Sequence, residues 1–232
     1  MKRQRIGVYG GTFDPVHCGH LSVARAVFEN FALDELIFVP AFVPPHKRGL
    51  EISAPQHRYA MLALATRHEA RWRVSTLELD APARPYTIET MAQLQTQCAD
   101  AALFFVMGMD SFRDVTLWRA HEALLTTYHT IVAGRPGYQQ DEVSDASHSA
   151  RHLAPALQAL VVDLRGGQLP TVEHFAAPHI FMTDYVAVDV SATTIRAAIA
   201  AGQSIAEWVP QAVADYVTKY SLYRDSDQKI EV

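Results

Sequence analysis

The sequence is poor in cysteine and has no long apolar run. Its 232 residues include only Cys18 and Cys98, too few for a disulfide framework and typical of a chain kept in a reducing cytosol. No apolar stretch approaches the roughly 20 residues that span a membrane. The basic start Lys2–Arg5 precedes an apolar stretch too short for a secretory signal. We therefore expect a cytoplasmic protein without a membrane partner.

A concentration of charge of one sign is also missing. The formal net charge is −5, with acidic and basic residues mixed along the chain. Nucleic-acid-binding domains normally gather basic residues on one face, so we expect no nucleic-acid partner. No linker divides the chain, which favours one domain over residues 1–224 and a frayed polar tail over 225–232. The sequence leaves the oligomeric state open, a homo-oligomer included.

Apolar residues, which make up 49% of the chain, occur in two kinds of run. Short continuous runs, typical of buried parallel strands, alternate with longer amphipathic ones. This alternation predicts a Rossmann-like, doubly wound α/β fold: a mainly parallel sheet with helices on both faces and a helical C-terminal portion. We expect strands at Ile6–Tyr9, Glu35–Val39, Arg73–Glu78, Ala102–Met107, Thr130–Ala133 and His179–Thr183. We expect helices at Leu21–Phe31, Gln56–Arg67, Thr87–Cys98, Thr194–Ala201 and Glu207–Tyr220, and loops at Pro40–Pro55 and Arg135–Ser149.

The junction of the first strand and helix carries Gly10-Gly11. Glycines let the backbone approach a ligand closely, and the helix that follows offers unpaired N–H groups to a phosphate. The segment lacks both the glycine spacing of a dinucleotide site and the Gly-Lys-Ser/Thr ending of a Walker loop. By itself, it indicates only a local phosphate site.

His17 and His20 strengthen this interpretation. At three residues apart near a helix start, both imidazoles can face the same pocket and donate hydrogen bonds to phosphate oxygens. Such contacts stabilise charge during phosphoryl or nucleotidyl transfer, which makes both histidines candidate catalytic residues. One alternative is that a histidine here merely caps the helix. Another is a metal site that includes Cys18, but this spacing suits three ligands of one zinc poorly.

A second candidate phosphate segment lies at Val190–Arg196. Hydroxyl groups before a helix cap its N-terminus, and the same geometry can bind an anion. Arg196, one turn into the helix, adds a planar cation suited to phosphate. Taken alone, the segment also fits an ordinary helix cap with a surface arginine.

The two segments together resemble the HxGH nucleotidyltransferase superfamily. The run from Gly10 to His20 matches its N-terminal signature, and Ser191, Thr193 and Arg196 match its C-terminal Ser-x-Thr-x-x-Arg motif. The resemblance implies an ATP site that contains Gly10, Gly11, Thr12, Phe13, Gly108, Asp110, Ser191 and Thr193, with His17, His20 and Arg196 both binding ATP and acting in catalysis.

Features between the two motifs resemble the bacterial nicotinate-nucleotide adenylyltransferases. They are Pro44-Pro45-His46-Lys47, Pro85-Tyr86-Thr87, Gly108-Met109-Asp110-Ser111, Leu117-Trp118 and Arg135-Pro136-Gly137, and with the ATP motifs they span nearly the whole chain. The resemblance implies an enzyme of NAD biosynthesis that joins nicotinate mononucleotide to ATP and releases deamido-NAD and pyrophosphate. Mg²⁺ would enter with ATP, without a metal site of the protein's own.

Each acceptor-side residue also has a physical interpretation. Trp118 can stack on a pyridine ring or can be an ordinary half-buried aromatic. The groups around Tyr86 and Thr87 can receive a carboxylate at a helix start, or Thr87 can simply cap the helix. Lys47 and Arg135 can contact phosphate or remain solvated.

Asp110 and Pro85 raise two further points. Asp110, after a strand end, can accept hydrogen bonds from a ribose or can cap a helix. Pro85 stands where the family usually has serine, so a backbone donor is lost there.

Three rival functions remain at this stage. One is an adenylyltransferase with another acceptor, such as nicotinamide mononucleotide or phosphopantetheine. Another is a nucleotide-binding module without catalysis, although His17, His20, Ser191, Thr193 and Arg196 are all present. A dehydrogenase is disfavoured because the dinucleotide glycine spacing is absent.

Overall fold

The computed structural model describes residues 3–42, 52–81, 83, 85–134, 150–185, 188 and 190–224. The expected loop at Pro40–Pro55 lies partly outside these residues, and the expected loop at Arg135–Ser149 and the expected tail over 225–232 lie wholly outside them. Within the described part of the chain, no helix is both long and apolar enough to cross a membrane.

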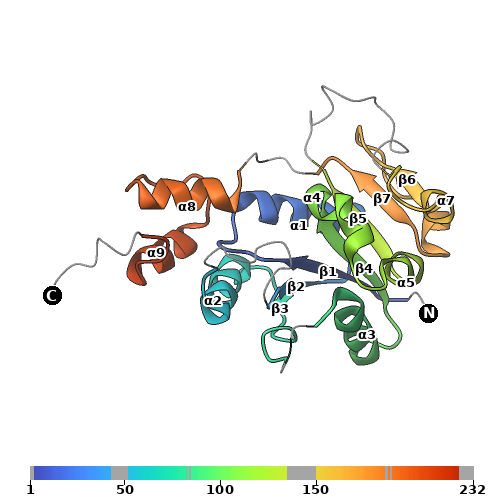
Figure 1. Ribbon diagram of the computed structural model, residues 1–232, viewed down its shortest axis with the longest axis horizontal. Coiled ribbons are helices and arrows are strands. Elements are labelled where there is room, and N and C mark those ends of the chain that lie inside the picture. The colour runs from blue at the N-terminus through green and yellow to red at the C-terminus, as the bar shows by residue number, and fades with distance from the viewer. Residues whose placement is uncertain are drawn as a thin grey trace.

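Seven strands form one sheet in which every neighbouring pair is parallel (Figure 1). The strands are β1 (Arg5–Gly11), β2 (Glu35–Pro40), β3 (Trp72–Val74), β4 (Ala102–Gly108), β5 (His129–Ala133), β6 (Val161–Asp163) and β7 (Ile180–Thr183). Their order is β3-β2-β1-β4-β5-β7-β6. The expected doubly wound, parallel fold is therefore confirmed.

The direction of winding reverses between β1 and β4. From β1 the chain continues outward to β2 and β3, then returns to pair β4 with the other side of β1. Crevices beyond the carboxyl ends of strands at such a reversal are where open α/β sheets bind ligands. Gly10-Gly11 ends β1 and Gly108 ends β4, so these three glycines of the expected ATP site lie at this reversal.

Helices cover both faces of the sheet. Those of eight residues or more are α1 (Cys18–Asn30), α2 (Pro55–Thr66), α3 (Thr87–Gln97), α8 (Ala192–Ala200) and α9 (Gln211–Lys219). Shorter turns are α4 (Met109–Arg113), η2 (Val115–Leu117), α5 (His121–Thr127), α7 (Pro155–Gln158) and η3 (Val172–Phe175). One buried cluster joins strand residues to α1, α2, α8 and α9, and a second joins them to α3, α4, α5 and α7.

The alternation of strand side chains explains the two clusters. Phe104 and Val106 of β4 belong to the first, whereas Leu103 and Phe105 belong to the second, because successive side chains point to opposite faces. Residues of both sets are nearly all buried, which accounts for the continuous apolar runs.

A buried histidine packs against the first cluster. The imidazole of His129 on β5 stacks on Phe104, with ring centroids 4.5 Å apart. Burial lowers the pKa of His129 to about 4, assisted by the positive charges of His179, Arg3 and Arg5. The ring is therefore neutral in the folded protein near pH 7.

Several expected boundaries were wrong. The third strand was expected over Arg73–Glu78, but β3 spans only Trp72–Val74 because it pairs with three residues of β2 at the sheet edge. The last helix begins at Gln211 rather than Glu207, since Pro210 is its N-cap. Strand β6 and the short helices were not predicted.

Candidate active site

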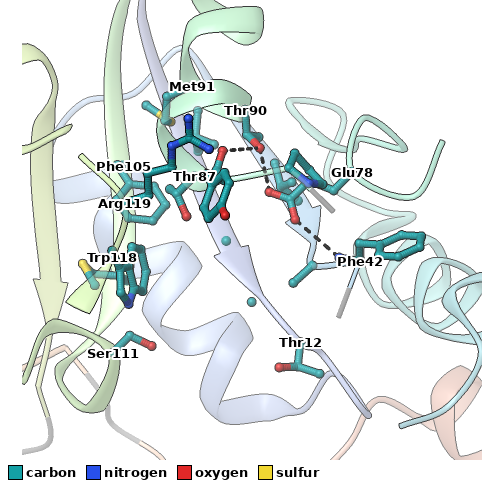
Figure 2. A pocket seen from close by; sticks show the side chains of 18 of the residues that line it. Thr12, Phe42, Glu78, Thr87, Thr90, Met91, Phe105, Ser111, Trp118 and Arg119 are labelled. Carbon is teal, nitrogen blue, oxygen red and sulfur yellow. Dashed lines mark hydrogen bonds between the residues drawn. The ribbon is translucent and has the colours of Figure 1, made fainter. Parts of the chain in front are cut away.

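Two cavities meet at the carboxyl ends of β1 and β4. The larger, of about 730 Å³, extends toward the starts of α1 and α8. The smaller, of about 250 Å³, extends toward the start of α3 (Figure 2). Gly10, Gly11, Thr12 and Ser111 line both cavities. A molecule in one cavity can therefore meet a molecule in the other across the end of β1.

The larger cavity gathers almost all the residues expected at the ATP site. Its lining includes Gly10, Gly11, Thr12, Phe13, His17, His20, Gly108, Asp110, Ser191 and Thr193. These residues come from three distant parts of the sequence, and the fold brings them together. Arg196 does not line the cavity directly, but it contacts Thr193, which does.

His17 and His20 form a reciprocal cap at the start of α1. The N–H of His20 donates to Nδ1 of His17 at 3.4 Å, and the N–H of His17 donates to Nδ1 of His20 at 3.3 Å. The two rings stack with centroids 3.7 Å apart. Because each Nδ1 accepts a hydrogen bond, each neutral ring carries its proton on Nε2. Each histidine can therefore donate a hydrogen bond from Nε2–H beside the larger cavity.

The backbone around these histidines is tightly packed. A Cβ added to Gly19 would lie 3.0 Å from Nδ1 of His17 and 3.1 Å from the carbonyl oxygen of Val188. Phe13 adopts a left-handed conformation with φ of 51°, and its buried ring lies 5.0 Å from that of His20. Neighbours on several sides therefore fix the imidazole positions.

Arg196 joins the two expected ATP motifs. One guanidinium nitrogen donates to the carbonyl oxygen of Asp14 at 2.7 Å, and another donates to the Thr193 hydroxyl at 3.3 Å. At the start of the same helix, Ser191 accepts a hydrogen bond from the N–H of Thr194 at 3.0 Å. The cap expected at Ser191 is therefore present, and the arginine is more than a surface charge.

A buried polar network behind the site has no counterpart in the sequence analysis. Asp14 accepts from the Tyr223 hydroxyl at 2.7 Å and from the N–H of Ser53 at 3.2 Å. Fully buried Arg58 donates to four carbonyl oxygens, including that of Thr12 at 3.0 Å. Burial lowers the pKa of Arg58, although the nearby Asp14 opposes this shift. The network ties the loop after β1 to α2 and to the C-terminal residues.

The smaller cavity has mainly apolar walls and a polar end at α3. Trp118 and Phe105 line it with their rings 6.2 Å apart, and Trp118 Nε1 is buried without a partner among the described residues. Tyr86 and Thr87 also line the cavity, as expected for an acceptor site. Thr87 is the first residue of α3 rather than its cap, because Tyr86 holds the cap position.

Three other expected residues have different outcomes. Lys47 and Arg135 lie outside the described residues, so their expected phosphate contacts stay predictions. Asp110 lines the larger cavity, but Gly108 is the N-cap of α4, so the capping interpretation of Asp110 is wrong. Arg165 and Asp184 line the same cavity and were not predicted, because nothing in their sequence surroundings resembles a phosphate motif.

Comparison with known proteins agrees with this geometry. A family model described as cytidylyltransferase-like matches residues 8–198. A protein of Desulfatibacillum aliphaticivorans, named a probable nicotinate-nucleotide adenylyltransferase, is 34% identical over 94% of this chain and 99% of its own length. A protein of the same name from Thermus thermophilus is 37% identical over 95% of this chain and 100% of its own. The chain belongs to this family. It is a nucleotidyltransferase of the nicotinate-nucleotide adenylyltransferase type.

A solved structure extends the likeness to the fold of the family. The nicotinic acid mononucleotide adenylyltransferase of Plasmodium falciparum, in complex with NaAD, superposes with a TM-score of 0.67 at 17% identity. The match covers 95% of this chain and 97% of the other.

Among the residues that the structure describes here, no group of three or more His, Cys, Asp or Glu side chains is placed to hold a metal ion. The alternative zinc site at His17, Cys18 and His20 is therefore unsupported.

Proposed function

We propose that this family member joins nicotinate mononucleotide to the AMP portion of ATP. ATP occupies the larger cavity and nicotinate mononucleotide occupies the smaller one. The observation that carries this assignment is that both cavities share Gly10, Gly11, Thr12 and Ser111. The names of the relatives and the NaAD in the Plasmodium structure support the choice of acceptor.

The proposed reaction is a direct displacement at the α-phosphorus of ATP. A 5′-phosphate oxygen of nicotinate mononucleotide forms the new bond to that phosphorus. The bond to the bridging oxygen of the β-phosphate breaks, and pyrophosphate leaves. A phosphate is already a nucleophile near neutral pH, so the step needs no covalent intermediate and no strong base. Catalysis then consists of alignment and charge stabilisation.

The two histidines supply charge stabilisation at the phosphates. Their Nε2–H groups donate to phosphate oxygens, while each Nδ1 remains engaged in the cap of α1. Thr193 and Ser191 stand at the start of α8, where backbone N–H groups favour an anion. Arg196 holds Thr193 and the carbonyl of Asp14 in place and adds positive charge nearby.

Mg²⁺ is proposed to enter as part of the substrate MgATP. Bound to ATP, it would neutralise negative charge on the leaving pyrophosphate. The phosphates and water would supply its ligands, because Mg²⁺ in such sites keeps several waters and few protein ligands.

Pyrophosphate release tests the proposed function directly. The protein would be assayed with MgATP and, in turn, nicotinate mononucleotide, nicotinamide mononucleotide and phosphopantetheine. We expect the highest kcat/KM with nicotinate mononucleotide. A preference for phosphopantetheine would overturn the acceptor, and no release with any of the three would favour a binding module. His20→Ala is expected to lower kcat by about 100-fold or more.

A further inference from the structure

Arg119 is a cation at one end of the smaller cavity, immediately after Trp118. It lines the cavity together with Tyr86 and Thr87, and its guanidinium carbon lies 4.6 Å from the centroid of the Tyr86 ring. Figure 2 shows Arg119 beside Thr87, at the end of the view opposite Thr12. Because Thr12 also lines the ATP cavity, Arg119 lies at the end away from the reacting phosphates.

Two charged side chains line this cavity among the residues that the structure describes, Arg119 and Glu78. The Glu78 carboxylate accepts a hydrogen bond from the Thr90 hydroxyl at 2.8 Å and another from the N–H of Phe42 at 3.4 Å. A carboxylate repels a second anion, so a cation in the same cavity favours the binding of a negatively charged ligand. No carboxylate of the described residues forms an ion pair with Arg119.

The start of α3 offers fewer backbone donors than its position suggests. Pro85 has no N–H, and the N–H of Tyr86 donates to the Glu89 carboxylate at 3.0 Å. Thr87 is the first residue of the helix, so its N–H has no acceptor within the helix. The N–H of Thr87 therefore remains as a donor next to the cavity, and a charged side chain can supply the interaction that the proline removes.

We propose that Arg119 determines the choice between acid and amide acceptors, by pairing its guanidinium with the pyridine carboxylate of nicotinate mononucleotide. This inference rests on the proposed function. The ring lies against Trp118, and its carboxylate points toward Arg119 and Thr87. The neutral carboxamide of nicotinamide mononucleotide gains no ion pair there, so it binds less well. The stack on Tyr86 orients the planar guanidinium for this contact.

The test compares both acceptors in Arg119→Gln and in a matched control. Arg71→Gln removes an arginine with a similar ring contact, 4.5 Å from the centroid of Phe28, but outside both cavities. In Arg119→Gln we expect kcat/KM for nicotinate mononucleotide to fall about 3- to 5-fold, the upper part of the range for an exposed charge pair. With nicotinamide mononucleotide it should change less than about twofold, and the KM for ATP should stay the same. Arg71→Gln should change neither.

Salt dependence gives a second measurement that a structural role would not produce. Because salt screens an exposed ion pair, the acid-to-amide ratio of the unaltered protein should fall between about 0.05 and 0.5 M NaCl. It should be nearly constant in Arg119→Gln. Equal losses with both acceptors, or a ratio unaffected by the substitution, would overturn the role of Arg119. If the unaltered protein used neither pyridine nucleotide, the proposed function itself would fail instead.

Discussion

His17→Asn separates two tasks that one side chain performs. Nδ1 of His17 accepts from the N–H of His20, which caps α1, whereas Nε2 is proposed to bind phosphate. Asparagine carries its acceptor oxygen on Cγ, where histidine carries Nδ1, but it has no atom in the position of Nε2. Asparagine is also among the best N-cap residues. The substitution therefore keeps the cap and removes the phosphate contact.

The expected magnitudes follow from these two roles. The free energy of unfolding of His17→Asn should lie within about 0.5 kcal/mol of the unaltered value, while His17→Ala should lose about 1 kcal/mol with the cap. The kcat of both variants should fall by about 100- to 1000-fold, the cost of removing one positioned donor. Urea unfolding measures the first quantity and pyrophosphate release measures the second.

The outcome distinguishes a cap from a catalytic group. His68→Asn serves as the control, because His68 is exposed and lies outside both cavities. If His17→Asn kept kcat within about threefold of the unaltered protein, His17 would act only as a cap and the phosphate role would be refuted.

Three further substitutions probe the surroundings of the site. Tyr223→Phe removes the hydroxyl that donates to buried Asp14 and should cost about 1.5–3 kcal/mol in urea unfolding; a loss below about 0.5 kcal/mol would contradict the network. Gly19→Ala places a Cβ 3.0 Å from Nδ1 of His17, so kcat should fall by about 10-fold or more, and an unchanged kcat would show that the ring can move freely. For His129, whose pKa falls to about 4 in the folded state from an ordinary 6.5, stability is lost as pH decreases from 6.5 toward 4, because only the unfolded chain binds the proton. Between pH 7 and pH 4, the free energy of unfolding measured in urea should fall by about 3 kcal/mol less in His129→Phe than in the unaltered protein. An equal fall in both proteins would contradict the lowered pKa of His129.

The sheet could be predicted because its inner strands are buried on both faces. Continuous apolar sequence marks β1, β2, β4, β5 and β7. The expected first and last residues of each strand lie within two residues of the observed ones. Strand β6 has only three residues, all half-buried at the sheet edge, and such a strand leaves no pattern distinct from a loop. The short helices α4, α5 and α7 were not predicted for a similar reason. Fewer than two full turns are too short to show a helical spacing of apolar residues.

The site was predictable where a motif carries the chemistry. Most of the expected ATP residues converge on one cavity, because the reversal of winding brings the ends of β1 and β4 together and the start of α8 lies beside them. Arg58 was missed because arginine is rarely buried, and only the tertiary structure shows the four carbonyl groups that surround it. Arg119 carried no recognisable signal either, since its role depends on a cavity that it forms with Tyr86, the distant N-cap residue of α3.

The histidine pair shows why two interpretations of one motif need not compete. A histidine at a helix start can be a cap or a phosphate ligand, and the sequence alone treats these as alternatives. In the structure, each Nδ1 accepts a backbone N–H at the start of α1, and this bond fixes the proton on the opposite ring nitrogen. Forming the first turn of the helix therefore sets the tautomer, the ring direction and the donor at once. His17 and His20 can serve the phosphates as oriented donors because they also cap the helix.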